Sequence, residues 1–527
     1  MKKILTTIRL YIFTYLPYSK LLKNSLDPLK VTHNNEEGYF IFNTVRNITP
    51  IMHIEFFLAF SLAKFGKKCI VILDNGTLEH WDSIHDINVL GPLTPLRSGF
   101  FKRAYTRFNR LLIKKIYSHK HIEFVYLDEL LFKANKLNLD ISNYKAIIES
   151  CSKSSCRRFS SNLDFWSNYE DQDYYKMSYR NSLKFALVAS YLIKNYKIEK
   201  LITSHGIYSC WGVMFKIFKE HGIKSLMYSE LIYKPQHILI SDTPHQKISS
   251  SDEWLDISSS KNLYLSPSQH RRIDTFFKNR LSYLGSDADY YFDQTKIQLP
   301  KLDLKNNGVV FGLFPNVVWD GDFEEVHGCF NSILDWVIQT VEQIKDTDNT
   351  LIIRCHPAEE NFHGDSPKLE PMLREAMPDI NLYKNIVIIS SNFKLDIYNF
   401  IEKNIDIALI YDGMLGLEIS YINKPVITVG KGRYSGSYFS EETNTKSDYL
   451  KLLKNPNELI ALFSEEKKLR TARLLRFAHW YLYEKSFFLP ILDANDFFGY
   501  NISNINKNDL FKEGSDYLRT INYLIDS

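Results

Sequence analysis

The sequence predicts an α/β protein built from two similar domains, each with a parallel β-sheet covered by helices on both faces. Apolar strand-like segments alternate with amphipathic helix-like segments in both halves of the chain, and a polar region near residues 245–300 interrupts the alternation. A chain of 527 residues is also too long for one hydrophobic core. We expect an N-terminal domain at 1–245, a linker or helical segment at 246–304, a second α/β domain at 305–455, and C-terminal helices at 456–527 that pack back on the first domain.

The first half contains strand-like segments rich in β-branched and aromatic residues, separated by helix-like segments. The predicted strands are residues 38–43, 68–74, 122–128, 200–206 and 224–230. The predicted helices include 51–65, 181–196 and 208–221. Parallel strands need long crossover connections, and these helices supply them.

The same alternation restarts at Gly308. The predicted strands are residues 308–315, 350–357, 385–391, 406–412 and 425–430. The predicted helices are 331–345, 367–377, 395–403 and 414–422, and Ser366-Pro367 is a typical helix start. We interpret this region as a compact nucleotide-binding type of α/β domain.

Bulk composition excludes several classes of protein. The net charge of +4 is too small to indicate a nucleic-acid partner, although it suits an anionic substrate or a membrane surface. The six cysteines show no zinc-binding spacing, which favours a reduced cytoplasmic protein without a metal. No apolar run reaches the ~18 residues of a membrane span. Residues 1–23 form either a packing helix or a basic amphipathic helix in peripheral contact with the inner membrane.

The most informative segment is Leu351–Glu359, LIIRCHPAE, where an apolar strand ends abruptly in polar residues. Arg354 and His356 are delivered to the mouth of the strand, Pro357 blocks its continuation, and Glu359 follows. Ligands of open α/β sheets collect at the carboxyl ends of strands. A guanidinium and an imidazole there suit a phosphate or diphosphate.

A second strand end carries glycines and acids. From the end of the strand at 406–412 the sequence reads DGMLGLE, and the candidate site residues in it are Asp412, Gly413, Met414, Gly416 and Glu418. Its glycines let the backbone approach a ligand closely, and the start of the following helix presents free N–H groups to an anion. We therefore expect these residues to bind a nucleotide.

Loops after two further strands of the second domain add candidates. Asn316 follows the strand at 308–315, and Lys431, Arg433 and Tyr434 follow the last strand, where they could contact a phosphate or an acidic sugar. Asp320-Gly321-Asp322 has the pattern of an acidic metal motif, but such triplets arise often by chance, and we expect no metal.

The N-terminal domain offers candidates for a catalytic base. His205 follows an apolar strand and precedes a glycine and a helix, so it is either a base, a phosphate ligand or a structural histidine. Glu230, at the end of the next strand, is a rival base. Asp74 and Glu55 are further rivals.

These segments are similar to one known family. LFPNVVWDGD, SILDWVIQTVEQI, LIIRCHPAE and YDGMLGLEISYINKPVITVGKGRY, together with SHGIYSCWG, resemble bacterial capsule polysaccharide biosynthesis proteins, the group of the Kdo transferases. The resemblance covers residues 308–440 best. It implies two facing Rossmann-like domains of the GT-B type, with a C-terminal helical crossover and the acceptor bound on the N-terminal side.

The same resemblance implies a function. A nucleotide sugar, often a CMP-activated acidic sugar, would bind the second domain, with His356 and Pro357 at the donor phosphate and Glu418 at the ribose. The acceptor would be a cell-surface polysaccharide, a lipopolysaccharide or a lipid-linked oligosaccharide. The enzyme would be a metal-independent, cytoplasmic glycosyltransferase without a cofactor. Asp412-Gly413-Met414 stands where many relatives carry hydroxyl residues, so hydroxyl contacts from this loop are not expected.

Two other functions remain open from the sequence. A CDP-polyol phosphotransferase of the teichoic-acid type would use two histidines, and His205 and His356 would be that pair. A non-catalytic subunit of capsule assembly or export would bind no nucleotide.

Overall fold

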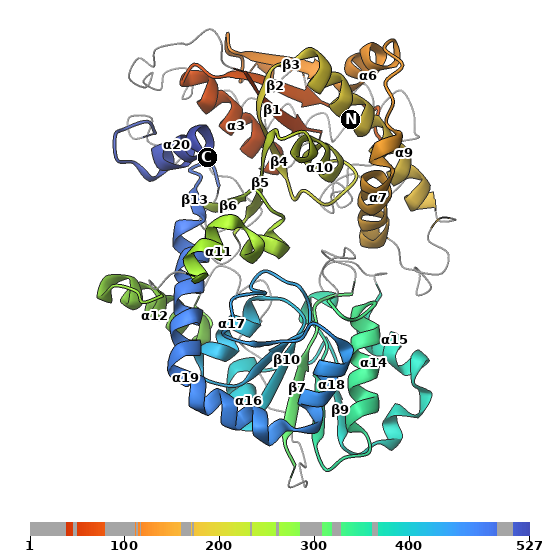
Figure 1. The fold of residues 1–527 in the computed structure, drawn as a ribbon, viewed down its shortest axis with the longest axis vertical. Helices are drawn as coiled ribbons and strands as arrows, with labels where there is room; N and C mark the ends of the chain where they lie inside the picture. The colour runs from red at the N-terminus through yellow and green to blue at the C-terminus, as the bar shows by residue number, and fades with distance from the viewer. Residues whose placement is uncertain are drawn as a thin grey trace, which may run out of the picture. The chain divides into compact units, whose positions relative to one another are not determined.

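The computed structural model describes residues 38–45, 50–79, 111, 114–115, 117–159, 170, 173–231, 234, 236–259, 263–284, 308–318, 328–360, 367–492 and 510–527. The chain divides into two compact units, each with its own sheet (Figure 1). The first comprises Met1–Cys156, Glu170–Pro244 and Lys485–Ser527, and the second comprises Arg157–Tyr169 and His245–Glu484.

The first unit contains a seven-stranded sheet in the order β13-β6-β5-β4-β1-β2-β3. Its strands are β1 (Tyr39–Thr44), β2 (Lys68–Leu73), β3 (Ile122–Tyr126), β4 (Ile198–Ser204), β5 (Lys224–Glu230), β6 (His237–Ser241) and β13 (Ser486–Phe488). The strands from β1 to β5 pair in parallel, as the sequence predicted. β6 and β13 pair antiparallel, so the prediction of a parallel sheet is wrong at this edge. The chain between β5 and β6 is too short for a crossover helix.

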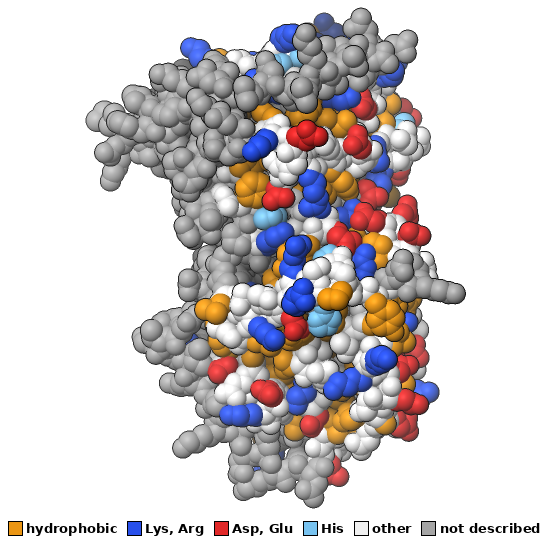
Figure 2. Space-filling view, turned by 90° about the vertical axis from the view of Figure 1, so that its left-hand side faces the viewer, with side chains coloured by type: hydrophobic (Ala, Val, Ile, Leu, Met, Phe, Trp, Pro, Cys, Tyr) orange, Lys and Arg blue, Asp and Glu red, His pale blue; other side chains and the backbone are white. Residues whose placement is uncertain are grey.

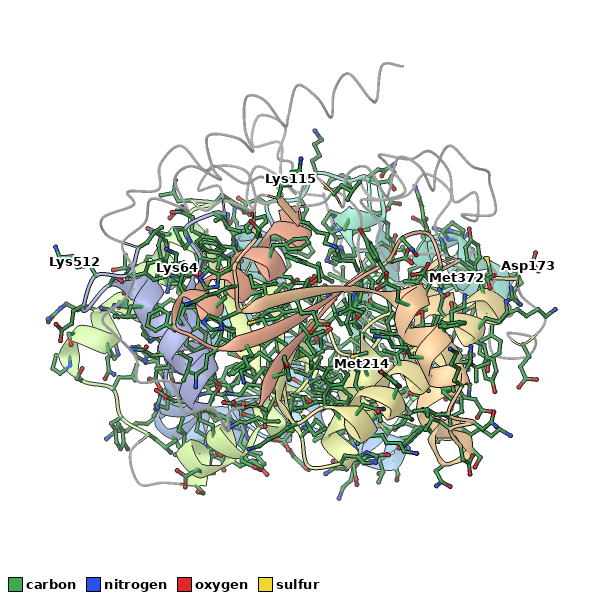
Figure 3. The ribbon with its side chains drawn as sticks, turned by 90° about the horizontal axis from the view of Figure 1, so that it is seen from above. Lys64, Lys115, Asp173, Met214, Met372 and Lys512 are labelled. Carbon is green, nitrogen blue, oxygen red and sulfur yellow. The ribbon has the colours of Figure 1, made fainter. Side chains whose placement is uncertain are left out.

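Two groups of helices accompany this sheet. One group contains α3 (Pro50–Lys64) and α20 (Asp516–Asp526). The other contains α6 (Leu127–Asn135), α9 (Asp173–Asn195) and α10 (Gly212–Glu220). A further helix, α7, spans Lys145–Phe159. Figure 1 shows α3 and α10 on opposite sides of the strands. Figure 3, seen from above, marks Asp173 in the first turn of α9 and Lys64 in the last turn of α3. Both charges suit the helix dipole at those ends.

The C-terminal segment completes the first unit. Tyr517 and Leu524 of α20 belong to the apolar core that also contains β1, β2 and α3. The buried Lys200 of β4 donates from Nζ to the carbonyl of Leu524 at 2.7 Å, which satisfies part of the end of α20. Burial lowers the pKa of Lys200 to about 8. Thus residues 485–527 join the first unit, whereas residues 456–484, which we expected to pack there too, belong to the second.

The second unit contains a six-stranded sheet in the order β12-β11-β10-β7-β8-β9. Its strands are β7 (Val310–Phe314), β8 (Thr350–Arg354), β9 (Ile386–Ile389), β10 (Ile407–Ile410), β11 (Val426–Thr428) and β12 (Glu441–Glu442). All neighbouring pairs are parallel, which confirms the predicted sheet and adds β12 to it. Every residue of β8 and β10 is buried, as expected for strands covered on both faces.

The helices of the second unit also form two groups. One contains α14 (Ile333–Ile344), α15 (Leu369–Ala376) and α18 (Lys446–Lys454), and the other contains α12 (Pro267–Leu281), α17 (Met414–Tyr421) and α19 (Pro456–His479). α11 (Asp252–Ser259) and α16 (Ile397–Asn404) complete the unit. In α14, Trp336 and Val337 are fully buried at the predicted helical spacing, and Ser332 caps the helix by accepting from the N–H of Asp335 at 3.0 Å.

α12 lies in the region that the sequence analysis treated as a linker. It docks within the second unit, where Phe277 stacks on Tyr421 of α17 with ring centroids 4.3 Å apart, and Tyr421 donates to Asp274 at 2.8 Å. Its exposed side carries His270, Arg271 and Lys278. Figure 2 views the side from which α12 projects, and Lys and Arg side chains are frequent there.

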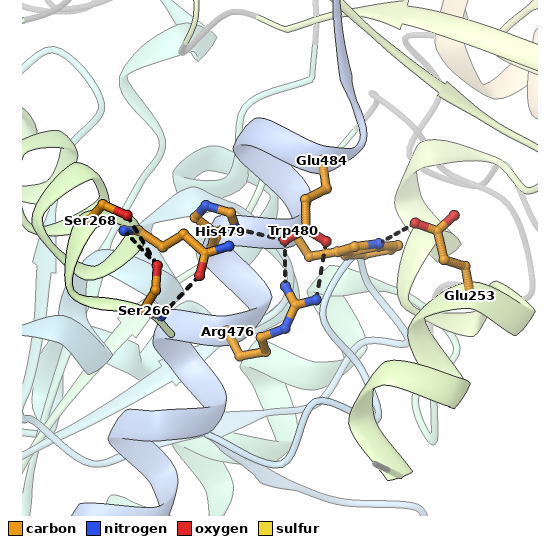
Figure 4. A network of polar contacts seen from close by, with 8 residues as sticks. Glu253, Ser266, Ser268, Arg476, His479, Trp480 and Glu484 are labelled. Carbon is orange, nitrogen blue, oxygen red and sulfur yellow. Dashed lines mark hydrogen bonds and ion pairs between the residues drawn. The ribbon is translucent and has the colours of Figure 1, made fainter. Parts of the chain in front are cut away.

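The end of α19 runs into a π-helical turn at Trp480–Glu484, where a polar network links three elements (Figure 4). Glu484 accepts from Arg476 at 2.8 Å and lies 2.7 Å from Nδ1 of His479, and the indole of Trp480 donates to Glu253 of α11 at 2.8 Å. This network holds α11 to the end of α19. No helix in the described part of the chain is long and apolar enough to cross a membrane.

Candidate functional site

The strand order of the second sheet reverses between β7 and β10, because β8 and β9 extend it on one side and β11 and β12 on the other. Such a reversal opens a crevice at the carboxyl ends of the two strands, where ligands of α/β sheets bind. Asn316 follows β7, and Gly413 follows β10 as the residue that caps α17. A Cβ placed on Gly413 would lie 3.7 Å from Oδ1 of Asn316. The fold therefore brings these two predicted site residues together.

The backbone of Gly413 is suited to an anion. Its φ of 127° is accessible to glycine and strained for other residues, and it contributes no side chain to cap the helix. Met414, which begins α17, is buried. The first-turn N–H groups of α17 are consequently not satisfied by an N-cap side chain, and they lie beside the Asn316 amide.

Asp412 organises the neighbouring loop instead of facing a ligand with both oxygens. Its Oδ1 accepts from the backbone N–H of Arg433 at 3.1 Å and from the guanidinium Nε of Arg433 at 3.3 Å. A Cβ on Gly432 would lie 2.3 Å from the same oxygen, so only glycine fits there. Both Asp412 and Arg433 were expected to bind the donor, and the structure pairs them with each other. Lys431, two residues before Arg433 in sequence, is exposed.

Arg354 ends β8, next to β7 in the sheet. It is only 6% exposed, and its guanidinium donates to the backbone carbonyls of Ser390 at 2.5 Å and Phe393 at 2.8 Å. Burial lowers its pKa to about 10, so it remains positively charged at neutral pH. The expected phosphate contact would have to use the remaining donors, because two bonds tie β8 to the loop after β9.

His356 is held in a defined orientation. Its Nδ1 accepts from the backbone N–H of Ala358 at 3.1 Å and so caps the short 3₁₀ helix Pro357–Glu359. Burial, and secondarily the charge of Arg354, lowers its pKa to about 4. The ring is therefore neutral at physiological pH, and because Nδ1 is an acceptor, the proton lies on Nε2. The imidazole therefore carries a single N–H group, at Nε2, just after the end of β8.

Glu359 is the buried acid of this segment. Its Oε1 accepts from the N–H of Leu369, at the start of α15, at 3.1 Å. Its Oε2 has no hydrogen-bond partner within the described residues, and the residue is 2% exposed. Burial raises its pKa to about 7. Glu359 was expected to contact the nucleotide sugar. In the structure, its Oε1 accepts from an N–H group at the start of α15, and its Oε2 has no hydrogen-bond partner among the described residues.

Glu418, which was expected to bind a ribose, is paired with other side chains in this structure. It is 2% exposed, Oε1 accepts from Arg280 of α12 at 2.9 Å, and Oε2 accepts from the hydroxyl of Tyr398 at 2.9 Å. Both oxygens are already bonded inside the protein. The structure therefore assigns Glu418 to the packing of α12 and α16 on α17.

Tyr434 is also placed differently from the expectation. It is fully buried, and a Cβ on Gly416 would lie 2.1 Å from its hydroxyl oxygen, so the glycine leaves room for the phenol ring. The ring belongs to an aromatic cluster with Phe439, 5.1 Å away between centroids. Gly416 and Tyr434 thus form a packing pair inside the second unit.

The first sheet reverses its strand order between β1 and β4, and His205 directly follows β4. Its φ of 52° is rare for a residue with a side chain, and its ring lies 5.6 Å from that of Trp211 in a stacked arrangement. Nδ1 is hydrogen bonded with the hydroxyl of Ser204. A strained, partly exposed histidine at a sheet reversal is a candidate for a functional residue.

The rival bases are placed less favourably. Oδ1 of Asp74 accepts from the N–H groups of Thr77 at 2.8 Å and Leu78 at 3.2 Å, which shapes the turn after β2. Glu55 is fully buried in α3. Glu230 ends β5, where its backbone is paired with Ile238, and its side chain lies outside the described residues. Asp320-Gly321-Asp322 and residues 1–23 lie outside them as well.

Comparisons with known proteins were made by sequence and by structure. No protein-family model and no curated protein matches the chain. Solved structures similar to it include the KpsC β-Kdo 2,7 transferase of Thermosulfurimonas dismutans, with 11% identity, a TM-score of 0.34, and 58% of this chain and 82% of that chain covered.

Two further similar structures cover more of the chain. A glycosyltransferase from Rickettsia africae has 12% identity and a TM-score of 0.25, covering 85% of this chain and 98% of that chain. A UDP-GlcNAc 2-epimerase from Neisseria meningitidis, bound to UDP-GlcNAc, has 9% identity and a TM-score of 0.27, with the same shares covered. These similar structures include the Kdo transferases that the motifs resemble. The TM-scores of these three structures are all below 0.5.

Sequence reasoning missed polar groups at the reversal of the first sheet. The side chain of Asn43, near the end of β1, donates to the carbonyl of Cys210 at 2.6 Å, and its Oδ1 has no partner within the described ranges. The same is true of the hydroxyls of Thr44 and Thr203, and all three residues are fully buried. The available signal was the polar end of an apolar strand, as in LIIRCHPAE. Within the described part of the chain, no three His, Cys, Asp or Glu side chains gather to hold a metal ion.

Proposed function

We propose that the chain is a glycosyltransferase that binds a nucleotide sugar in its second unit and a glycan acceptor in its first. One observation carries the proposal: the Asn316 amide, the glycine start of α17 and the neutral His356 stand at or beside the reversal of the second sheet. N–H donors without excess charge suit a leaving phosphate, because they stabilise its developing negative charge without a metal.

The roles follow from the contacts of each group. His356 donates from Nε2 to a phosphate oxygen, and Asn316 and the first turn of α17 bind the remaining oxygens. Arg354 adds positive charge nearby while holding the loop after β9. In the first unit, His205 is the proposed base that accepts the proton of the acceptor hydroxyl.

The finer assignment follows the motif resemblance. The donor is a CMP-activated acidic sugar, and the acceptor is a growing cell-surface polysaccharide or lipopolysaccharide at the inner face of the membrane. Glu418 is left out of this proposal, since Arg280 and Tyr398 occupy its oxygens.

Nucleotide binding tests the proposal directly. A ligand of the native state raises the melting temperature by mass action, so CMP, CDP, UDP and GDP are compared by thermal shift and calorimetry. At least one should bind, and Asn316→Ala should weaken it about tenfold, the loss of one hydrogen bond to a charged group. Asn279→Ala, an exposed position on α12, is the control. Absence of binding by all four nucleotides would leave the non-catalytic alternative.

His356 permits a matched pair of variants that separates chemistry from folding. In His356→Asn the amide oxygen takes the place of Nδ1 and keeps the cap on Ala358, but the Nε2 donor is lost. In His356→Gln the amide nitrogen takes the place of Nε2, and the cap is lost. We expect the Asn variant to be the more stable and the Gln variant to retain more transfer activity, with His356→Ala inactive yet folded. If His356→Asn turned over faster than His356→Gln, the proposed hydrogen bond from Nε2 to the phosphate would be refuted.

A second candidate function is transfer of a polyol phosphate from a CDP-polyol. It is favoured by the position of one histidine directly after a strand in the first unit and another two residues after β8 in the second. The products distinguish the two reactions. With CDP-glycerol labelled in the β-phosphorus, a phosphotransferase moves the label to the acceptor, whereas a glycosyltransferase moves only the sugar of a nucleotide sugar.

A further inference from the structure

The second unit contains a pocket of about 600 Å³ next to the candidate site, a volume typical of small-ligand sites. It is formed by the loop after β11, the strand β12, the 3₁₀ helix His245–Ser250 and the middle of α19. Gly432 contributes to it and also packs against Asp412. The loop after β11 therefore belongs to both the candidate site and the pocket.

The lining is rich in small polar groups and in cations. Hydroxyl and amide side chains come from Ser249, Ser250, Thr428, Ser435, Ser440, Thr443 and Asn444. Four cations and two carboxylates accompany them, namely Lys247, Lys431, Arg470, Arg473, Glu441 and Glu442. This composition suits a ligand with many hydroxyls and a negative charge.

The two carboxylates are already satisfied inside the protein. Glu441 accepts from Arg470 at 2.8 Å. Glu442 accepts from the backbone N–H of Gly436 at 2.7 Å and more weakly from that of Tyr438 at 3.4 Å, and burial raises its pKa. Lys431 is exposed and makes no ion pair with any described residue. The positive charge of the pocket is consequently not cancelled by its own acids.

Tyr438 stands at the pocket in a conformation that costs free energy. Its φ is 57°, a left-handed value that is unfavourable for a residue with a side chain, and 58% of the residue is exposed. Contacts with two side chains hold this conformation. The backbone N–H of Tyr438 donates to Glu442, and Arg473 donates to the carbonyl of Tyr438 at 3.3 Å. The guanidinium of Arg473 also lies 5.5 Å from the centroid of the tyrosine ring. An aromatic ring kept in water by such bracing is a platform for the apolar face of a sugar ring.

Thr443 also lines the pocket, is 8% exposed, and has its side chain next to Cys329.

We propose that this pocket binds a glycosyl residue that bears a carboxylate or phosphate, with the sugar ring on Tyr438 and its negative group at Lys431 and Arg473. The proposal deepens the transferase function and rests on it for the identity of the substrate. The same chemistry has two sources: the acidic sugar of the nucleotide donor, or a residue of a free acidic glycan.

Isothermal titration of the full chain separates these sources. CMP is compared with CMP-N-acetylneuraminate, and a hyaluronan tetrasaccharide is compared with the uncharged maltotetraose. If the pocket takes the donor's sugar, CMP-N-acetylneuraminate binds more tightly than CMP, and Tyr438→Ala or Lys431→Ala abolishes that difference. If it takes a free glycan, hyaluronan tetrasaccharide binds without nucleotide, and either substitution weakens it about tenfold.

Matched variants guard against general effects of substitution. Tyr264→Ala and Lys403→Ala remove exposed side chains of the same types outside the pocket, and they should leave the affinity for each probe unchanged. Tyr438→Phe keeps the aromatic ring and should therefore keep the binding. The proposal is overturned if neither acidic probe binds, if binding is indifferent to Tyr438 and Lys431, or if maltotetraose binds equally well. If hyaluronan tetrasaccharide binds in a Tyr438-dependent way but CMP, CDP, UDP and GDP all fail to bind, the pocket assignment stands and the transferase function is rejected.

Discussion

At the scale of single residues, burial drives a neighbouring histidine and glutamate toward their neutral forms. The pKa of His356 falls to about 4 and that of Glu359 rises to about 7, both chiefly because a charge is costly in a poorly solvated site. Arg354 keeps its charge despite its own lowered pKa. The end of β8 thus combines one cation with two hydrogen-bonding groups of tunable protonation.

The raised pKa of Glu359 predicts a pH-dependent stability. Because the native state binds this proton more tightly than the unfolded state, the contribution is full below pH 4.5, the ordinary value, and is lost as pH rises through about 7. Glu359→Gln removes the titration but keeps an acceptor for Leu369. Relative to the variant, the wild-type protein should lose about 2–3 kcal/mol between pH 4.5 and pH 8.

Urea unfolding at a series of pH values measures this difference. Subtracting the variant from the wild type cancels the other titrating groups, which are common to both. A constant difference across the range would show that Glu359 titrates normally.

At the scale of elements, one buried ion pair decides how α12 is held. Arg280 is 138 residues from Glu418 in sequence, yet its guanidinium binds that carboxylate, and the pair has 13% and 3% of its side chains exposed. Residues 246–304, which contain α12, were expected to be a linker or helical segment, and Glu418 was expected to bind a ribose. Neither expectation included this contact, because the sequence around one charged residue does not show which distant residue it will pair with.

Breaking this pair from one side should be costly. Glu418→Ala leaves Arg280 buried without a counter-charge, so we expect a loss of about 3–5 kcal/mol in the free energy of unfolding. Replacing both partners, with Arg280→Met and Glu418→Leu, should recover most of it. Chemical denaturation of the wild type, the single variant and the double variant measures both changes in the free energy of unfolding.

Nucleotide affinity of the double variant separates packing from binding. If Glu418 only packs, the folded double variant should bind nucleotide like the wild type. A large loss of affinity in a stable double variant would restore the ribose role.

At the scale of the whole molecule, each sheet reverses its strand order once within its parallel part, and polar residues gather at both reversals. In the first unit these are His205 and Asn43, and in the second Asn316 and Gly413. A two-unit transferase would divide its substrates between such positions.

Hydrogen exchange can test that division in the intact chain. A bound nucleotide should slow exchange at the start of α17 and after β7 and β8, because it satisfies and covers those N–H groups. Amides of β3 and α6 in the first unit should be unaffected. Protection confined to the first unit would contradict the assignment of the donor to the second.

Much of the fold was predictable because it depends on local patterns. Buried parallel strands such as Thr350–Arg354 are apolar throughout, and α14 repeats its apolar residues with the period of a helix. The antiparallel β6 and β13 were missed, since β13 is three residues long and pairs with a strand far away in sequence. Short edge strands have too few residues to show a period.

By itself, the sequence determined the α/β class, the succession of most strands and helices, and the strand ends at which polar side chains accumulate. Only the tertiary structure decided which of those side chains are available. Asn316 and Gly413 lie close together at a sheet reversal, whereas Glu418 and Tyr434 are buried in contacts with other side chains. The physical reason is that helices and strands depend on neighbours along the chain, while burial and the pairing of a polar group depend on residues that only folding brings near.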